Sequence, residues 1–414
     1  MNLRRLAVAL AVWGAVHATW AEFRAGIAVR VVTPQPLLPV SGGIGPSEPV
    51  TRKDGDLTVR ALVLADGDTR VALVSVDFLG FPAVLGDRVR SLVQGIPAEN
   101  ILIGATHTHS APDPYGFPDE TGKTGADLNY LKFVVEQAGA AVNDALNRLA
   151  PASVKIATGE ARGKIAYNAY AEALFDPRCV VVQCLDAAGK PMATLVNYAV
   201  HPEVFGSRAG TCSPDLVGPL YDRLAELGAG TGIFLNGAQG GMVTADNRGP
   251  DGRDVSSWAE CVRIGNRLAE EAVRMVSDAP VQREPGLECR ARTIRFPVES
   301  QVLLAVLRGS PMGYATDTDG RVSARLNHVR LGDAEMLTIP GEALPNVGAY
   351  LKRKMRGKHQ LLLGLTNDAY GYILAKEDWG AFRRYEYISR TCLGERTGEI
   401  LVNEALALIA EASK

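Results

Sequence analysis

Hydrophobic and polar positions alternate with two different periods along the chain, and each change of period predicts a change of element. Residues 69–81, TRVALVSVDFLGF, form a β-branched apolar run typical of a buried strand. Residues 84–96 carry apolar side chains at helical spacing, and residues 100–109, NILIGATHTH, again have the pattern of a strand. This order predicts a β-α-β unit.

The same mixture continues along the rest of the sequence. A 3.6-residue period with good helix formers predicts a helix over residues 128–149. Further helices are predicted at 214–227, 256–277, 343–356 and 397–412, and further strands at 150–163, 179–201, 232–237, 288–298, 334–341 and 360–367. The pattern therefore predicts an α/β (mixed α+β) fold, with one large layered domain in which helices flank a central mixed sheet.

Composition adds size and charge to this picture. With 414 residues and 47% hydrophobic content, the chain can bury a large core. Its 44 Lys and Arg residues nearly balance 46 Asp and Glu residues, which gives a net charge of −2. No basic field indicates a nucleic acid or an anionic membrane surface, so we expect no nucleic-acid partner.

Residues 1–21 are expected to form a signal peptide. Arg4 and Arg5 precede the apolar stretch LAVALAVWGAV, and a cut after Ala21 is plausible. An uncleaved anchor is the alternative, but the apolar run is shorter than the roughly 20 residues that a spanning helix needs. We expect a secreted or periplasmic protein in which residues 22–414 form one domain without a transmembrane segment, and its oligomeric state stays open.

The six cysteines form no CxxC pair, which argues against a cysteine zinc site. In an exported chain they could form disulfides, and they could equally be buried free thiols. The sequence alone leaves both possibilities open.

Two of the six histidines, His107 and His109, lie two residues apart at the end of the predicted strand 100–109. Side chains at positions i and i+2 of a strand point to the same face, so both imidazoles would face one space. One could bind a metal ion while the other contacts substrate. A pair of surface histidines in a polar loop would give the same pattern.

Other polar side chains come just after predicted apolar strands: Asp77, His201, Glu342 and Tyr372. Ligands of α/β proteins gather outside the carboxyl ends of strands, so we expect these side chains to converge on one crevice. Two of them have simpler interpretations. Asp77 could be a structural hydrogen-bond acceptor, and Glu342 could favour a helix N-terminus.

Six motifs in a fixed order carry a family resemblance. They are TVRALVLADGDTRVALVSVDFLG, ATHTHSAP, NYAVHPEVFG, FLNGAQGGMVTAD, IPGEAL and LTNDAYGYI, spread between Phe23 and Glu404. Together they resemble the catalytic domain of the neutral/alkaline (non-lysosomal) ceramidase family. The resemblance implies a zinc amidase that cleaves the N-acyl bond of ceramide to sphingosine and a fatty acid.

The resemblance also implies roles for individual residues. The zinc ligands would be His107, His201, Glu342 and Tyr372, with one position open for water or the substrate carbonyl. Tyr372 is preferred over Tyr370 because the step from Gly371 to Tyr372 matches a Gly-Tyr step of the family. His109 would hydrogen-bond the substrate or relay a proton, and metal-activated water would attack the N-acyl carbonyl.

Several positions depart from the family pattern. The family's serine loop is replaced by NGAQGGMVTAD, which is longer by two residues, so Thr244 is the nearest hydroxyl and Met242 replaces an acidic neighbour. Thr244 is therefore our candidate catalytic hydroxyl. Ala169 stands where the family has an arginine. The family continues into a C-terminal β-sandwich, whereas this sequence stops at Lys414, so we expect a divergent member without that module.

Three functions fit these observations. The first is a zinc hydrolase of an amide or ester bond in a small or lipid-like N-acyl substrate. The second is a metal-containing ligand-binding protein with weakened catalysis, and the third is a hydrolase of a different bond on the same site. Gly240 and Gly241 fit either an oxyanion cradle or a simple turn. His328 and His359 are expected at the surface.

Overall fold

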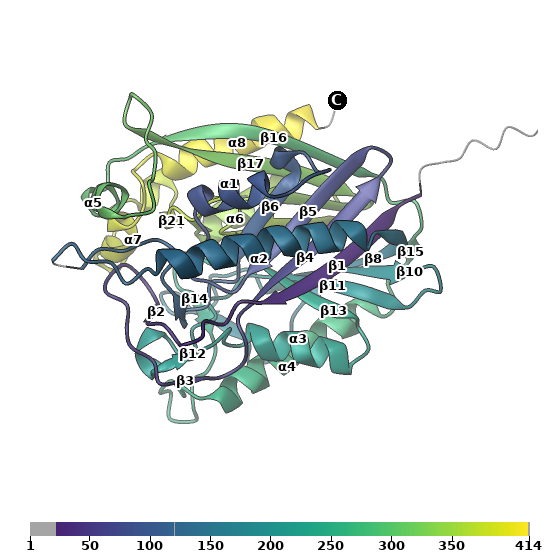
Figure 1. Ribbon diagram of the computed structural model, residues 1–414, viewed down its shortest axis with the longest axis horizontal. Coiled ribbons are helices and arrows are strands. Elements are labelled where there is room, and N and C mark those ends of the chain that lie inside the picture. Colours follow the sequence, from purple (N-terminus) through teal and green to yellow (C-terminus); the bar gives the residue numbers. More distant parts are fainter. Residues whose placement is uncertain (1–21, 120, 413–414) are drawn as a thin grey trace, which may run out of the picture.

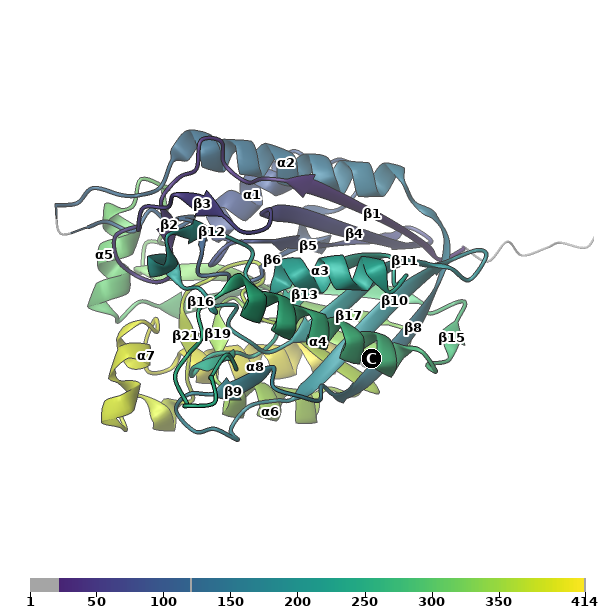
Figure 2. The same ribbon diagram turned by 90° about the horizontal axis from the view of Figure 1, so that it is seen from below.

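Two stacked sheets enclosed by two layers of helices build the protein (Figures 1 and 2), as seen in a computed structural model that describes residues 22–119 and 121–412. The predicted signal peptide, residues 1–21, lies outside the described residues.

The larger sheet is mixed and has nine strands in the order β13-β11-β10-β8-β1-β4-β5-β6, with β15 paired to β8. Its members are β1 (Arg24–Val31), β4 (Thr58–Asp66), β5 (Thr69–Val76), β6 (Ile101–Ala105), β8 (Ala150–Glu160), β10 (Arg178–Asp186), β11 (Pro191–Tyr198), β13 (Thr231–Asn236) and β15 (Val281–Gln282). The pairs β5–β6 and β11–β13 are parallel, and the other pairs are antiparallel. Each edge of the sheet therefore ends in a parallel pair.

The smaller sheet has the order β16-β17-β18-β20 and consists of β16 (Leu287–Pro297), β17 (Arg321–Leu331), β18 (Ala334–Thr338) and β20 (His359–Leu363). Its pair β18–β20 is also parallel. Helices α6 (Pro345–Lys354) and α8 (Thr397–Glu411) cover its outer face (Figure 2).

Both faces of the larger sheet are buried along strands such as β5, β6 and β13, which explains why these strands are largely apolar. Leu62 and Leu64 point to the smaller sheet, whereas Ala61 and Val63 point to the helices. The helices on that face are α1 (Ala83–Ser91), α2 (Leu128–Asn147), α3 (Val217–Glu226) and α4 (Trp258–Val276). The continuous apolar pattern of the sequence thus reflects a sheet sandwiched between helices and a second sheet.

Short elements gather at one end of the sandwich, on the left of Figure 2. They include β2 (Val40–Ser41), β3 (Arg52–Lys53), β7 (Ala111–Pro112), β9 (Ala166–Asn168), β12 (Thr211–Cys212), β14 (Val243–Ala245), β19 (Glu342–Ala343), β21 (Tyr372–Ile373), α5 (Gln301–Gly309) and α7 (Glu386–Arg390). Four 3-10 turns complete the described elements: η1 (Ala98–Asn100), η2 (Ser207–Ala209), η3 (Lys376–Asp378) and η4 (Arg383–Tyr385).

The predicted α/β fold class is confirmed. The structure also shows features that the hydrophobic pattern of the sequence did not predict. The second sheet faces the first directly, and the predicted elements do not include α5 and β17. The strand predicted to reach residue 109 ends at Ala105. Among the described residues, no helix is long and apolar enough to cross a membrane.

Two smaller questions are also answered. All six cysteines are free thiols, and all but Cys289 are buried.

The expectation that His328 and His359 lie at the surface is wrong, because both are buried. His328 Nε2 lies 2.7 Å from Glu335 Oε1, and His359 Nδ1 lies 2.8 Å from Thr158 Oγ1, so each polar ring is satisfied inside the protein.

Candidate active site

Asn236, the last residue of β13, holds three strand ends together. Its Nδ2 donates to the backbone carbonyls of Thr106 at 3.0 Å and Val200 at 2.7 Å, and its Oδ1 accepts from the amides of Val200 at 3.2 Å and Gly237 at 2.9 Å. Thr106 and Val200 directly precede His107 and His201. One buried amide therefore fixes the spacing between the chain segments that carry these two histidines.

His107 follows β6 in a left-handed backbone conformation, with φ of 74°. For a residue with a Cβ this conformation costs roughly 1–2 kcal/mol, so the surrounding structure must hold it. The backbone N–H of His107 donates to Phe78 O at 2.9 Å, and its ring Nδ1 bonds Leu79 O. Because Nδ1 is engaged with this carbonyl, Nε2 is the ring nitrogen that faces the site.

His201 has the same arrangement. It follows β11, its Nδ1 lies 2.8 Å from Val243 O, and its Nε2 lies 3.1 Å from Glu342 Oε2. His107 Nε2 lies 3.5 Å from the same carboxylate oxygen. Two ring nitrogens from different strand ends thus converge on one buried carboxylate. The histidine pair is not a surface pair, and His107 is only 3% exposed.

Glu342 and Tyr372 come from two short paired strands that follow the smaller sheet. Glu342 pairs in register with Tyr372 between β19 and β21, and its backbone N–H donates to Gly371 O at 2.8 Å. Both side chains line one cavity together with His107 and His109. The Tyr372 hydroxyl donates to Met242 Sδ at 3.3 Å. The Glu342 carboxylate faces the histidines, so it does more than precede helix α6.

His109 completes a group of three histidines with His107 and His201, whose ligand atoms all lie within 4.8 Å of one another. Its Nε2 is buried and has no hydrogen-bond partner among the described residues, and its Nδ1 lies 3.3 Å from Glu203 Oε2. Glu203 was not a sequence candidate, although an acidic residue two positions after His201 is a signal that could have revealed it.

Burial and charge set the protonation of these groups. Burial opposes ionisation of Glu342, but the charges and hydrogen bonds of His107 and His201 hold its pKa well below its usual range. Burial also opposes the charged form of His201, but the hydrogen bond to Glu342 and the charge of Glu203 raise the pKa of His201 to about 9. Burial lowers the pKa of His109 to about 3, so this ring is neutral at pH 7.

Thr244 lies beside the site but not in the cavity wall. Its backbone forms a parallel bridge with His201, and the described residues that line the cavity do not include it. Its hydroxyl faces Glu203 and favours the charged form of that carboxylate, which helps to lower the pKa of Glu203 against the effect of burial. A direct contact between Thr244 and substrate therefore stays a prediction.

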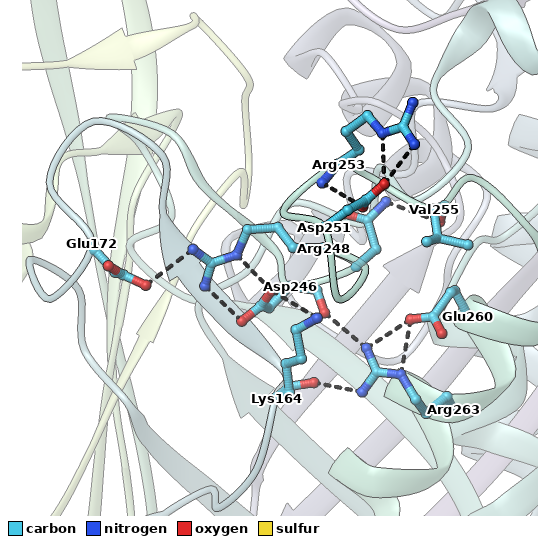
Figure 3. Close-up of polar contacts among 10 residues, drawn as sticks. Lys164, Glu172, Asp246, Arg248, Asp251, Arg253, Val255, Glu260 and Arg263 are labelled. Carbon is cyan, nitrogen blue, oxygen red and sulfur yellow. Dashed lines mark hydrogen bonds and ion pairs between the residues drawn. The ribbon is translucent and has the colours of Figure 1, made fainter.

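A network of ion pairs fixes the segment behind Thr244 (Figure 3). Asp246, the residue after β14, accepts from Nε and Nη2 of Arg248, each at 2.9 Å, and its backbone carbonyl accepts from Arg263 Nη2 of α4 at 2.8 Å. Arg248 Nη1 also reaches Glu172 at 3.0 Å. Since β14 supplies the carbonyl that holds His201 Nδ1, this network indirectly orients the imidazole.

Gly240 and Gly241 serve the close approach of two chain segments. Gly240 N–H donates to Ala343 O at 3.0 Å, and a Cβ at Gly240 would lie 2.2 Å from Glu342 O. Gly241 has φ of +72°. The simple turn, rather than an oxyanion cradle, accounts for this pair.

Asp77 is also structural, because its carboxylate accepts from Thr58 N and Thr58 Oγ1, each at 2.7 Å.

The rest of the cavity is mainly apolar and aromatic. Leu303, Val306 and Leu307 of α5 form one wall, with Leu79 and Phe117 beside them. A cavity of this type with a few convergent polar groups is the usual form of a small-molecule site.

Comparison with known proteins identifies this architecture. No family model and no curated protein matches the sequence. Neutral ceramidase from Pseudomonas aeruginosa has a similar structure, with a TM-score of 0.75 and 17% identity over 94% of this chain and 75% of that chain. A ceramidase complexed with C2 has a TM-score of 0.74 and 17% identity, over 94% of this chain and 76% of that chain.

The described fold is thus the α/β fold found in these structures. The chain has the neutral ceramidase fold, and the resemblance seen in its motifs is confirmed at the level of the fold. At 17% identity it is a divergent example.

The role of Asn236 can be tested by Asn236→Asp. The carboxylate would place charge against two backbone carbonyls that now receive N–H groups, so we expect a loss of roughly 2–4 kcal/mol in the free energy of unfolding. Urea denaturation measures it. Asn143→Asp is the matched control, because Asn143 Nδ2 donates to Leu92 O in an exposed bond, and it should cost under about 1 kcal/mol. Equal losses in the two variants would contradict the role of Asn236.

Proposed function

We propose that the protein is an exported, metal-dependent amidase that hydrolyses the N-acyl bond of ceramide-like compounds. The observation that carries this proposal is the convergence of His107 Nε2 and His201 Nε2 on one Glu342 oxygen, at 3.5 and 3.1 Å, beside an apolar cavity that His107 and Glu342 line. The ceramidases of known structure share the fold that places these side chains.

The donor set fits a divalent cation. Both imidazoles use Nδ1 on a backbone carbonyl, which is the usual support of a metal-binding histidine, and a carboxylate and a phenol complete the set. His107, His201, Glu342 and Tyr372 would hold the ion. Imidazole and carboxylate ligands suit zinc, which we take as the natural metal. When bound, such an ion polarises a carbonyl oxygen and lowers the pKa of water.

The remaining polar groups would transfer the proton of the attacking water. His109 Nε2 is buried and unpaired, so it is placed to accept a proton from the attacking water and return it to the leaving amine. Because burial lowers the pKa of this ring to about 3, its charged form needs a partner. Glu203 beside Nδ1 would stabilise the charged ring while it holds that proton. The apolar wall around Leu303 and Val306 would bind the acyl chain and exclude water.

Two other functions are distinguished by the measurement of metal content and turnover described below. A ligand-binding protein with weakened catalysis is favoured by the position of Thr244 outside the cavity wall. A hydrolase of another bond would use the same ligands on a different substrate.

Metal content and turnover test the proposal together. We expect about one zinc ion per chain by elemental analysis and cleavage of a fluorescent N-acyl-sphingosine that a chelator abolishes and zinc restores. Zinc without cleavage would favour binding or another substrate, and a metal-free protein would contradict the site.

The two neighbouring histidines should respond differently to substitution. His107→Ala removes a proposed ligand and should abolish zinc binding, whereas His109→Ala should keep the metal and lower kcat by about 100-fold or more. Zinc content and kcat are measured on both variants. Equal loss of zinc in His109→Ala would show that His109 is a ligand, as the group of three histidines also allows.

Glu203 should act through His109. Glu203→Ala should lower kcat by about 10- to 100-fold with zinc content and KM nearly unchanged, because the ring loses its orienting carboxylate. Glu335→Ala is the matched control, since it breaks a different carboxylate–histidine pair, with His328, away from the cavity. It should lower the melting temperature but leave kcat of the folded enzyme intact. An unchanged kcat in Glu203→Ala would refute the role.

A further inference from the structure

A carboxylate outside the proposed metal and proton-transfer groups lies in the wall of the same cavity. Asp368 belongs to the loop after β20 and is 2% exposed. Its Oδ1 accepts from the backbone N–H of Ala369 at 2.8 Å. Its Oδ2 is buried and has no donor in hydrogen-bond geometry among the described residues, although the amide of Ala83 and the hydroxyl of Tyr370 lie close enough to favour the charged form of the carboxylate. A buried carboxylate oxygen without a donor is costly, so a ligand that brings a donor would gain binding energy here.

The surroundings of Asp368 supply little positive charge. Of the described residues that line the cavity, none is Lys or Arg. The nearby Arg90 guanidinium donates to Ile101 O, Asp87 and Asn367. Burial raises the pKa of Asp368 to about 7, which is the response of a carboxyl group that lacks a close cationic partner.

Tyr314 and Tyr370 also line this part of the cavity, and the hydroxyl of each donates to a backbone carbonyl. Tyr370 OH donates to Ser323 O at 3.2 Å, and Tyr314 OH donates to Tyr115 O at 3.2 Å. The Tyr370 hydroxyl also lies near enough to Asp368 to interact with its charge. These rings give the carboxylate an aromatic wall, which tolerates both neutral and cationic groups.

We propose that Asp368 is a specificity-determining residue that accepts a hydrogen bond from a hydroxyl or ammonium group of the substrate. The inference rests on the proposed amidase function and narrows its substrate class. Preferred substrates are N-acyl compounds whose amine half carries a hydrogen-bond donor. Compounds with an anionic amine half are rejected, because they would meet Asp368 and Glu342 without a Lys or Arg in the described cavity wall.

A matched set of amides tests this inference on the full-length protein. N-dodecanoyl ethanolamine carries a hydroxyl, N-dodecanoyl ethylenediamine an ammonium, N-dodecanoyl glycine a carboxylate, and N-dodecanoyl propylamine no donor. For the wild type we expect the first two to exceed propylamine in kcat/KM by about tenfold or more, and glycine to be the poorest substrate.

Substitutions assign the preference to one side chain. Asp368→Leu should lower kcat/KM for the ethanolamine amide about 10- to 100-fold while the propylamine amide changes little. Asp368→Asn keeps an acceptor but no charge, so it should retain the hydroxyl preference and lose the ammonium preference. Asp68→Asn is the matched control, because Asp68 is exposed in the turn between β4 and β5 and does not line the cavity, and it should preserve every ratio.

The outcomes separate this inference from the proposed function. Equal changes for all four amides in Asp368→Leu would show a purely structural role and overturn it. If the wild type hydrolyses none of them, calorimetric Kd values for the same set decide: a donor preference that Asp368→Leu removes supports the binding contact without the amidase function. If none of the four amides binds and no preference for a donor is seen, the inference is wrong.

Discussion

The buried amide of Asn236 is the constraint on which the site depends. Parallel strands at the two edges of the larger sheet end near each other, and backbone groups at such ends lack ladder partners. Asn236 supplies two donors and an acceptor with two lone pairs, and uses them on the segments before His107 and His201. A side chain of the same shape that lacked either the N–H donors or the carbonyl acceptor could not join the two segments. The distance between the imidazoles is therefore set by the fold, before any ligand binds.

A second constraint is electrostatic. Burial of a carboxylate beside two imidazoles is unfavourable unless positive charge compensates it. Without a metal, His201 serves this purpose, which is why its pKa rises to about 9 while that of Glu342 falls. A cation at the same place would supply the compensation and release the proton of His201. The same arrangement of charge thus suits both the metal-free protein and a metal-bound form.

Much of the fold could be predicted from periodicity, because apolar spacing identifies which faces must be buried. The helices α2, α4 and α8 lie close to their predicted bounds, and His201 and Glu342 follow strands as expected. The stacking of a second sheet could not be predicted, since a strand that is buried on both faces looks the same against a helix or a sheet. The left-handed backbone of His107 is likewise a product of long-range contacts with Phe78 and Leu79.

The site residues that the sequence missed depend on contacts between distant segments. Glu203 meets His109 only because the segment after β11 lies against the segment after β6, where His109 N–H donates to Pro202 O at 3.2 Å. In the longer loop after Asn236, Met242 contacts the Tyr372 hydroxyl. The acidic neighbour that the resemblance leads one to expect at Met242 is thus absent, while Glu203 brings a carboxylate to the histidines from another segment. A sequence motif shows which residue type stands at a given position of the chain. The site instead requires a charge at a given place in space, and a residue from a different segment can supply that charge.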